Sequence, residues 1–223
     1  MPQESSNLIQ VEQKNPFETS KVKRKLNTKD CRILFLYPNE RGMSTIPPSI
    51  TSLSQILKDE GHQTALFDTT FYKFDDEISI EDSEVTKSKS LENRPVLERD
   101  DDDIHFKKTT RSAVLDFEAS IENFKPDFIA VSCTETTFLR AIKLIDQTRH
   151  KNIKNLFGGV FPTFAPDLVM NYKNVDMICV GEGENAIIDL ANSISNNEDY
   201  SNVTNLWIKQ NDGKITKNSI SRP

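Results

Sequence analysis

The sequence predicts an α/β protein whose core is an open sheet of five parallel strands in the order 2-1-3-4-5. Short, nearly continuous apolar runs alternate along the chain with segments whose apolar residues recur at helical spacing. Such runs are typical of strands buried on both faces of a parallel sheet, and the helices between them supply right-handed crossovers. Five such runs are present, whereas the six-strand dinucleotide-binding layout needs one more strand and helix.

The first part of this sheet is predicted before residue 69. Arg32–Tyr37 is the first strand, and Gln63–Asp68 is the second. The helix between them begins at Pro47 and Pro48, since proline suits the first helical turn. Its apolar face is formed by Ile50, Leu53, Ile56 and Leu57. Gly61 suits the residue that ends it.

Three more strands and their helices are predicted after residue 110. The strands are Asp127–Cys133, Ile153–Phe157 and Asp176–Val180. A first apolar stripe, ended by Pro126, is formed by Val114, Phe117, Ile121 and Phe124. A second is formed by Phe138, Ala141, Ile142 and Ile145, and a third by Ile187, Leu190, Ala191 and Ile194. A short helix over Ala165–Tyr172 precedes the fifth strand, so helices alternate with strands throughout.

The segments outside this pattern differ in composition. Residues 1–30 are polar and predict a flexible leader before a domain over residues 31–195. Residues 74–110 form a charged insertion, and its run Asp100–Asp103 is predicted to be a solvated loop. Residues 196–223 contain two short apolar segments around Asn211-Asp212-Gly213, which predicts a β-hairpin over Leu206–Lys209 and Lys214–Thr216.

Composition argues against several classes of protein. The net charge of −6 gives no basic face for nucleic acid. No apolar run reaches the roughly 18 residues that a membrane span requires, and the polar start lacks the apolar centre of a secretory signal, which predicts a cytoplasmic protein. The three cysteines are far apart and form no CxxC or CxxxCxxC spacing, so neither a metal site nor a disulfide framework is expected. His62, His105 and His150 are expected at the surface, and no set of catalytic residues is found.

In a sheet of this order, ligands bind beyond the carboxyl ends of the strands, where the order reverses. After the fourth strand, the paired glycines of Gly158–Thr163 permit close approach of a ligand, or merely form a tight turn. After the fifth, Gly181–Glu184 offers backbone N–H groups, and its acids either bind a ligand or favour the start of a helix. After the third, Thr134 either contacts a ligand or caps a helix. The long loop after the first strand contains no GxGxxG or GxxxxGK[ST] motif and no receiver aspartates.

Taken in order, these segments resemble the cobalamin-binding domain of cobalamin-dependent radical S-adenosylmethionine (radical SAM) enzymes, which is flavodoxin-like (Rossmann-like). The resemblance covers residue 31 to about residue 195. It is carried by Ile46-Pro47-Pro48, Gly61-His62, Phe67-Asp68, Pro126-Asp127, Ala130-Val131-Ser132, the GGVFPT of residues 158–163 and the GEGE of residues 181–184.

The resemblance implies a cobalamin that lies across the strand ends, with its nucleotide tail between the sheet and the helices. Lining the tail would be Ser132, Thr134, Gly158, Gly159, Phe161, Pro162 and Thr163. The far side would be closed by Gly181, Glu182 and Gly183, and the corrin ring would face Asn39, Glu40 and Arg41.

Three departures from related proteins qualify this expectation. The loop after the first strand lacks the DxHxxG motif, so no histidine from it can bind cobalt, and a base-off cobalamin is expected. Phe161 stands where many relatives have a histidine and cannot donate a hydrogen bond. The CxxxCxxC loop that holds a 4Fe-4S cluster beside S-adenosylmethionine is missing, and residues 196–223 would begin the linker to that barrel.

The expected function is therefore a binding module without a complete active site of its own. It would hold cobalamin for methyl transfer or related radical chemistry on a radical SAM barrel, either in a missing part of the same chain or in another chain. The alternative is a degenerate domain that has lost cobalamin and acts as an interaction module or scaffold. The fold alone does not decide between them.

Overall fold

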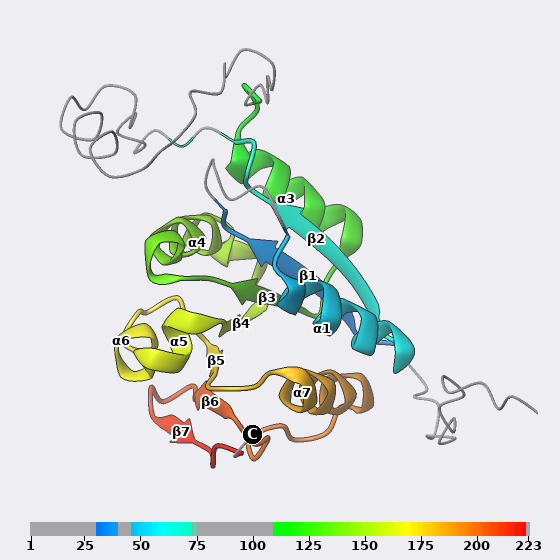
Figure 1. Cartoon of the computed structure of the whole chain (residues 1–223), viewed down its shortest axis with the longest axis vertical. Helices are drawn as coiled ribbons and strands as arrows, with labels where there is room; N and C mark the ends of the chain where they lie inside the picture. The colour runs from blue at the N-terminus through cyan, green and yellow to red at the C-terminus, as the bar shows by residue number, and fades with distance from the viewer. Residues whose placement is uncertain (1–29, 40–45, 73, 75–108, 222–223) are drawn as a thin grey trace, which may run out of the picture.

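The computed structural model describes residues 30–39, 46–72, 74 and 109–221. Its single mixed sheet has the order β2-β1-β3-β4-β5-β6-β7 (Figure 1). The strands are β1 (Arg32–Tyr37), β2 (Gln63–Asp68), β3 (Phe128–Ser132), β4 (Lys154–Gly158), β5 (Met177–Cys179), β6 (Leu206–Lys209) and β7 (Ile215–Lys217). The first five pair in parallel, and β6 and β7 pair antiparallel. The predicted parallel order 2-1-3-4-5 is confirmed.

Helices cover both faces of this sheet (Figure 1). They are α1 (Pro48–Asp59), α3 (Ala113–Phe124), α4 (Glu135–Gln147), α5 (Val160–Phe164), α6 (Pro166–Met170) and α7 (Glu184–Asn196), with a short 3-10 turn at Arg149–Lys151. One apolar core lies under α1 and α7 and includes Phe35, Ala130 and Leu190. The other lies under α3, α4 and α6 and includes Phe117 and Phe138. The inward side chains of each parallel strand alternate between these two cores.

Local sequence signals set most helix ends as predicted. Pro47 and Pro48 occupy the N-cap and first positions of α1, and Gly61 follows its C-cap with a φ of +89°. Helix α3 ends at Lys125, whose φ is +52°, one residue before Pro126. Proline cannot continue a helix, and a left-handed residue turns the chain away, so the two signals act together.

Three predictions about local structure were wrong. The stretch after Gly159 is helical, because Val160–Phe164 forms α5, while the helix predicted over Ala165–Tyr172 is confined to Pro166–Met170. Proline in the first turn of α5 is tolerated, since the N–H that it lacks has no partner inside the helix. The predicted strand over Ile153–Phe157 is shifted by one residue, to Lys154–Gly158.

The C-terminal hairpin continues the sheet. Strand β6 pairs antiparallel with β5, and the turn at Gly213 has a φ of +83°. Leu206 and Ile208 are buried in the core under α1 and α7. Lys217 of β7 lies over the Trp207 ring, 4.1 Å from its centroid, and forms an ion pair with Asp167 of α6. The hairpin is therefore packed against the five-stranded unit.

The residues on either side of the charged insertion lie side by side. Thr109 donates a backbone hydrogen bond to Phe71 at 2.7 Å, and Tyr72 forms a parallel bridge with Thr109. The predicted leader over residues 1–30, except for residue 30, and most of the insertion over residues 74–110 lie outside the described residues. Within the described ranges, no helix is both long and apolar enough to cross a membrane.

Candidate functional site

The carboxyl ends of β1, β3, β4 and β5 meet at one edge of the sheet, called the carboxyl edge below. Ser132 and Gly158 are partners in the register of β3 and β4. Gly159, α5 and the Gly181–Glu184 loop follow at the same edge. Most of the residues predicted to bind a ligand therefore lie together.

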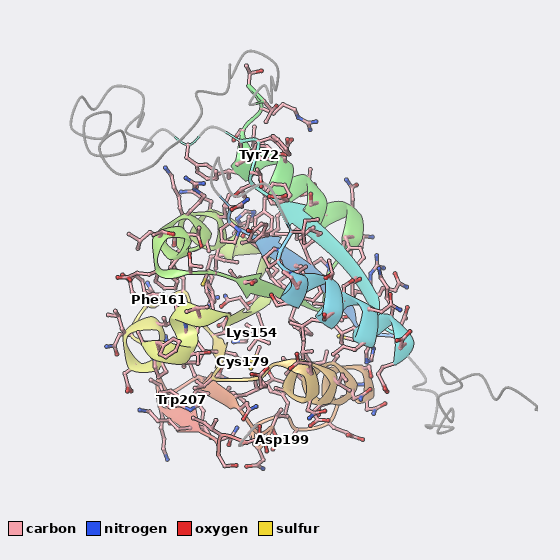
Figure 2. The ribbon with its side chains drawn as sticks, viewed as in Figure 1. Tyr72, Lys154, Phe161, Cys179, Asp199 and Trp207 are labelled. Atoms are coloured by element: carbon pink, nitrogen blue, oxygen red, sulfur yellow. The ribbon has the colours of Figure 1, made fainter. Side chains whose placement is uncertain are left out.

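On the face covered by α1 and α7, this edge is lined by small residues around Gly158, Cys179 and Gly183, and their position is called the slot below. A Cβ atom built on Gly158 would lie 4.0 Å from the Cβ of Cys179, and one on Gly183 would lie 3.9 Å from the Cys179 sulfur and from Leu53. Ser132 shares this face by strand alternation. Sequence reasoning missed Leu53 and Cys179, which form walls of the slot because Leu53 belongs to α1 and Cys179 ends β5. Figure 2 marks Cys179 at this position.

The loop after β5 carries backbone hydrogen-bond donors beside the slot. Among the described residues, the backbone N–H groups of Glu182 and Gly183 have no acceptor. The N–H of Gly181, in contrast, donates to Thr163 Oγ1 at 3.2 Å. Two of the backbone donors predicted in this loop are thus available to a ligand, and the third joins the loops after β4 and β5.

Asn205 holds the loop after β5 in place and was not found from the sequence. Its side chain is buried, and its Nδ2 donates to the Glu182 carbonyl oxygen at 2.8 Å. Its Oδ1 accepts the backbone N–H of Ser221 at 2.7 Å, and its own carbonyl accepts the N–H of Val180. Asn205 has a φ of +69°, a conformation that asparagine tolerates better than most residues.

Gly159 shapes the loop after β4 through its backbone. Its φ is +103°, and a Cβ there would lie 2.7 Å from the carbonyl oxygen of Cys133. Only glycine fits this position without movement of the backbone. Thr163 Oγ1 donates to the Gly159 carbonyl at 2.9 Å and so closes the first turn of α5.

Phe161 and Pro162 point into the protein from α5. The Phe161 ring lies 5.1 Å from the ring of Phe138, on the face opposite the slot. Pro162 is buried. The sequence could not give the direction of these side chains, because a helix of five residues has too few turns to show an apolar stripe.

Thr134 occupies the N-cap position of α4, one of the two roles considered for it. Its N–H donates to Thr137 Oγ1 at 3.0 Å, and its hydroxyl lies 3.0 Å from that of Thr136. The side chain of Thr134 is nevertheless exposed at the carboxyl edge. Capping and ligand contact are compatible at this residue.

The loop after β1 is tied to its neighbours through Asn39. Its side chain is buried and donates a hydrogen bond to Thr70 Oγ1 at 2.8 Å. Its backbone carbonyl accepts a hydrogen bond from the Arg140 guanidinium at 2.6 Å. The side chain of Asn39 therefore points into the protein. Glu40 and Arg41, predicted to face the corrin ring, lie outside the described residues.

Two buried thiols flank the glycine loop. Burial raises the pKa of Cys133 to about 12. Burial, with the nearby carboxylates of Glu184 and Glu182, raises the pKa of Cys179 to about 12 as well. Both thiols are therefore protonated at neutral pH and act as small apolar residues.

The expectation that all three histidines lie at the surface was wrong for His62. This residue is only 4% exposed, and its Nδ1 accepts the N–H of Cys31 at 3.2 Å. The chain turns from α1 into β2 at this point, which brings the ring under the start of β1. His150 is exposed and contacts Glu118, whereas His105 lies outside the described residues.

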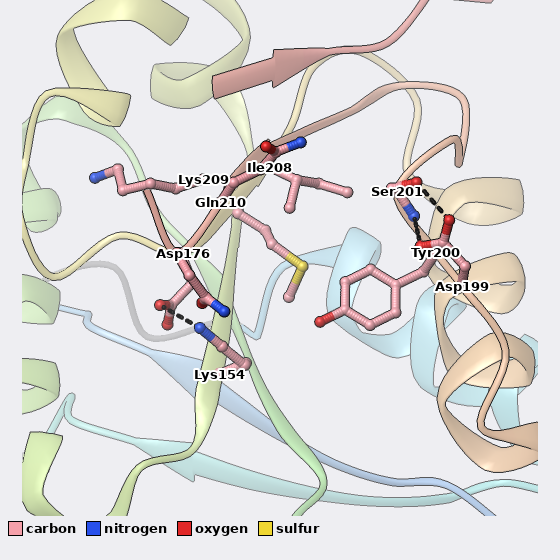
Figure 3. A pocket seen from close by; sticks show the side chains of 10 residues that line it. Lys154, Asp176, Asp199, Tyr200, Ser201, Ile208, Lys209 and Gln210 are labelled. Atoms are coloured by element: carbon pink, nitrogen blue, oxygen red, sulfur yellow. Dashed lines mark hydrogen bonds and ion pairs between the residues drawn. The ribbon is translucent and has the colours of Figure 1, made fainter. Parts of the chain in front are cut away.

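A separate hollow of about 240 Å³ lies at the opposite, amino end of the sheet (Figure 3). Lys154 and Asp176 line one side of it and Tyr200 the other. Asp176 already accepts hydrogen bonds from Arg149, at 2.8 and 2.9 Å, and from Asn155. The charged groups here satisfy one another, and the hollow has no connection with the slot at the carboxyl edge.

The comparisons with known proteins agree with this placement. Residues 96–191 match the family model of the B12 binding domain, which includes β3, β4, β5 and the glycine loops after them. The resemblance to a B12 binding domain over this part of the chain and the flavodoxin-like fold are thus confirmed. No curated protein matches the chain.

Solved structures with the same fold include two radical S-adenosylmethionine enzymes. The radical S-adenosylmethionine methyltransferase TsrM from Kitasatospora setae, solved with tryptophan and a SAM analogue, is 18% identical with a TM-score of 0.61 over 86% of this chain. A second TsrM structure, with cobalamin and a [4Fe-4S] cluster bound, is 17% identical to this chain with a TM-score of 0.60. The cobalamin-dependent radical enzyme OxsB, with aqua-cobalamin and S-adenosylmethionine bound, is 14% identical with a TM-score of 0.55 over 87% of this chain. The chain spans only 30% of TsrM and 23% of OxsB.

Proposed function

Since residues 96–191 match the B12 binding domain family, we propose that this chain binds cobalamin at the carboxyl edge of its sheet. It serves as the cobalamin-binding module of a radical SAM enzyme. The observation that carries the proposal is the slot of small residues between β3, β4, β5 and the loop before α7. A slot of this kind is what a long nucleotide tail needs between a sheet and its helices.

The residues of the slot fit the chemistry of that tail. Gly158 and Gly183 carry no side chain, and a Cβ at either would come within 4.0 Å of Cys179, so a larger side chain would occupy the position assigned to the tail. The N–H groups of Glu182 and Gly183 and the hydroxyl of Ser132 supply donors to phosphate, ribose and amide oxygens. The carboxylate of Glu182 is exposed and accepts hydrogen bonds from hydroxyl or amide groups.

The corrin ring belongs over the loop after β1, where Glu40 and Arg41 are expected to face it, while the buried side chain of Asn39 ties the loop to Thr70. Residues 38–46 contain no histidine, so this loop would give cobalt no imidazole ligand. A tail held in the slot would keep its base away from cobalt, so the bound form would be base-off. Cobalamin supplies methyl-group transfer or related radical chemistry. The chain's own residues bind and orient it, while S-adenosylmethionine and a 4Fe-4S cluster belong to a barrel joined in cis or supplied in trans. A cytoplasmic location is part of the same proposal.

The test is a spectroscopic titration of the purified chain with hydroxocobalamin and methylcobalamin. A saturable change toward the base-off spectrum is expected. Gly158→Val should abolish it, because the new side chain enters the slot, while the ordinary contacts around Gly158 let the strand fold. Gly213→Asn is the matched control: it also fills a glycine, but at the hairpin turn, where nothing lies within 4 Å.

Unfolding curves of all three proteins show whether each variant is folded. Equal binding by Gly158→Val and the wild type would place the tail elsewhere. A folded wild-type chain that shows no saturable change would overturn the cobalamin proposal and leave the scaffold as the better function.

A further inference from the structure

Large exposed apolar side chains of the described residues gather around the carboxyl edge. Nine are exposed, and seven of them lie on segments that follow a strand's carboxyl end or lie beside such a segment: Ile46, Phe71, Leu115, Leu139, Val160, Phe164 and Ile220. Exposed apolar residues scattered singly need no explanation, but a group at one edge indicates a contact surface.

Three of these residues lie around the contact between α5 and the loop after β5. Val160 is 61% exposed and Phe164 is 83% exposed, and they are one helical turn apart on the outer side of α5. Ile220 is 51% exposed, and its Cγ2 lies 3.7 Å from where a Cβ of Gly181 would be. Gly181 is in turn bonded to Thr163, the neighbour of Phe164. Val160, Phe164 and Ile220 are called the α5 patch below.

The α5 patch is separate from the slot. The slot opens on the face of α1 and α7, whereas α5 packs on the opposite face through Phe161 and Phe138. A nucleotide tail in the slot would therefore leave Val160 and Phe164 in water. Burying exposed apolar side chains of this size is favourable, so a second occupant would gain from covering them.

We propose that the α5 patch is the docking surface for the radical SAM barrel, which contacts it through apolar side chains of its own. This inference rests on the proposed function. The reactive side of a cobalamin held at the carboxyl edge must meet its substrate there, so the protein that holds the substrate lies over this edge. TsrM and OxsB, in which this fold occupies 30% and 23% of the chain, carry much further protein beside it.

A photo-crosslinking experiment tests the docking. Benzoylphenylalanine is placed at position 164 of the full chain, in the cells that make it, and crosslinked peptides are identified by mass spectrometry. The matched control carries the same group at position 66, since Leu66 is an exposed apolar residue within strand β2, at the other edge of the sheet. Crosslinks from position 164, but not from position 66, to a polypeptide with a CxxxCxxC motif are expected. Crosslinks only within the described domain, only to a second copy, or none, would overturn the proposal.

The cobalamin titration separates this inference from the proposed function. In Val160→Thr/Phe164→Ser, cobalamin affinity should equal that of the wild type, while crosslinking of the barrel from position 139, next to Phe138 on α4, should be lost. A fall in cobalamin affinity would assign the α5 patch to the cofactor and overturn the docking surface. Failure of the wild-type chain to bind cobalamin would instead remove the proposed function, and barrel crosslinks could still be scored.

Discussion

The side-chain amide of Asn205 donates to the carbonyl oxygen of Glu182 at 2.8 Å and ties the segment before β6 to the loop that offers backbone donors to the slot. The same side chain accepts the N–H of Ser221 at 2.7 Å. The C-terminal hairpin is therefore part of what holds the candidate site in shape, although its residues are not predicted to touch the ligand.

Replacing Asn205 should weaken both the fold and cobalamin binding. Asn205→Gly keeps the left-handed backbone at a φ of +69° but removes the buried hydrogen bonds. Loss of these bonds should cost about 1–3 kcal/mol in the free energy of unfolding, measured by urea denaturation. The affinity for cobalamin should fall because the loop after β5 loses an anchor.

Asn197→Gly is the control for that change. Asn197 has a similar φ of +56° but is exposed at the end of α7. Replacement by glycine at position 197 makes the unfolded chain more flexible to the same extent as replacement at position 205. If the two variants lose the same stability and affinity, the Asn205 side chain has no anchoring role.

Alanine substitutions at Gly159 and Gly61 allow the cost of backbone strain to be distinguished from the cost of a steric clash. Both have positive φ, but a Cβ at Gly61 meets nothing within 4 Å, while one at Gly159 meets Cys133 oxygen at 2.7 Å. Gly61→Ala should cost about 1–2 kcal/mol, the strain of the backbone alone. Gly159→Ala should cost clearly more in the same urea unfolding experiment, and equal losses would show that the loop after β4 can move aside.

The sequence was sufficient for the sheet because its information is local and periodic. Arg32–Tyr37 is a short apolar run, and Gly61 and Pro126 stand at the ends of helices. Such signals were enough to predict the strands, the helices and the strand order. The pairing of β6 with β5 did not follow, because no local pattern tells a hairpin which edge of a sheet it will extend.

The candidate site was predictable where glycine marked it and not elsewhere. Gly158 and Gly183 were identified because small residues at strand ends leave space. Asn205 was missed, since it acts on Glu182 from 23 positions away in the chain. The inward direction of Phe161 was missed for another reason, because α5 was expected to be a loop.

Asp176 should be essential for stability at the amino end of the sheet. Its side chain is 7% exposed and accepts two hydrogen bonds from Arg149 and two from Asn155. Burial raises the pKa of Asp176, but Arg149 and Lys154 outweigh burial, and the pKa lies below its usual range. Asp176→Ala leaves Arg149 and Asn155 without their partner and should cost about 3 kcal/mol or more.

Asp167→Ala provides the comparison, because Asp167 pairs with Lys217 but is 74% exposed. An exposed ion pair contributes at most about 1 kcal/mol. Cobalamin binding should be unaffected by either change in protein that remains folded. A similar small loss for both variants would show that the network around Asp176 adds little.

His62 should make the fold sensitive to mild acid. Its Nδ1 accepts the N–H of Cys31, which requires a neutral ring. Burial lowers the pKa of His62, although Asn192, Glu60 and Asp30 act in the opposite direction. The pKa in the folded chain therefore lies below the value of about 6.5 of an unfolded chain. As pH falls below about 6.5, the unfolded state binds the proton first, and the free energy of unfolding decreases by up to about 1.4 kcal/mol per pH unit.

Urea unfolding of the wild type, His62→Gln and His150→Gln at about pH 7.5 and about pH 5.5 measures this contribution. Glutamine at position 62 keeps an acceptor for Cys31 but cannot bind a proton in this range, so the loss of stability on acidification should be smaller than in the wild type. His150 is exposed and contacts Glu118 on the surface, so His150→Gln should retain the acid sensitivity that arises from His62. The same decrease in stability in wild type and His62→Gln would show that protonation of His62 does not oppose folding, and that the ring can leave its place beneath β1 without disturbing the sheet.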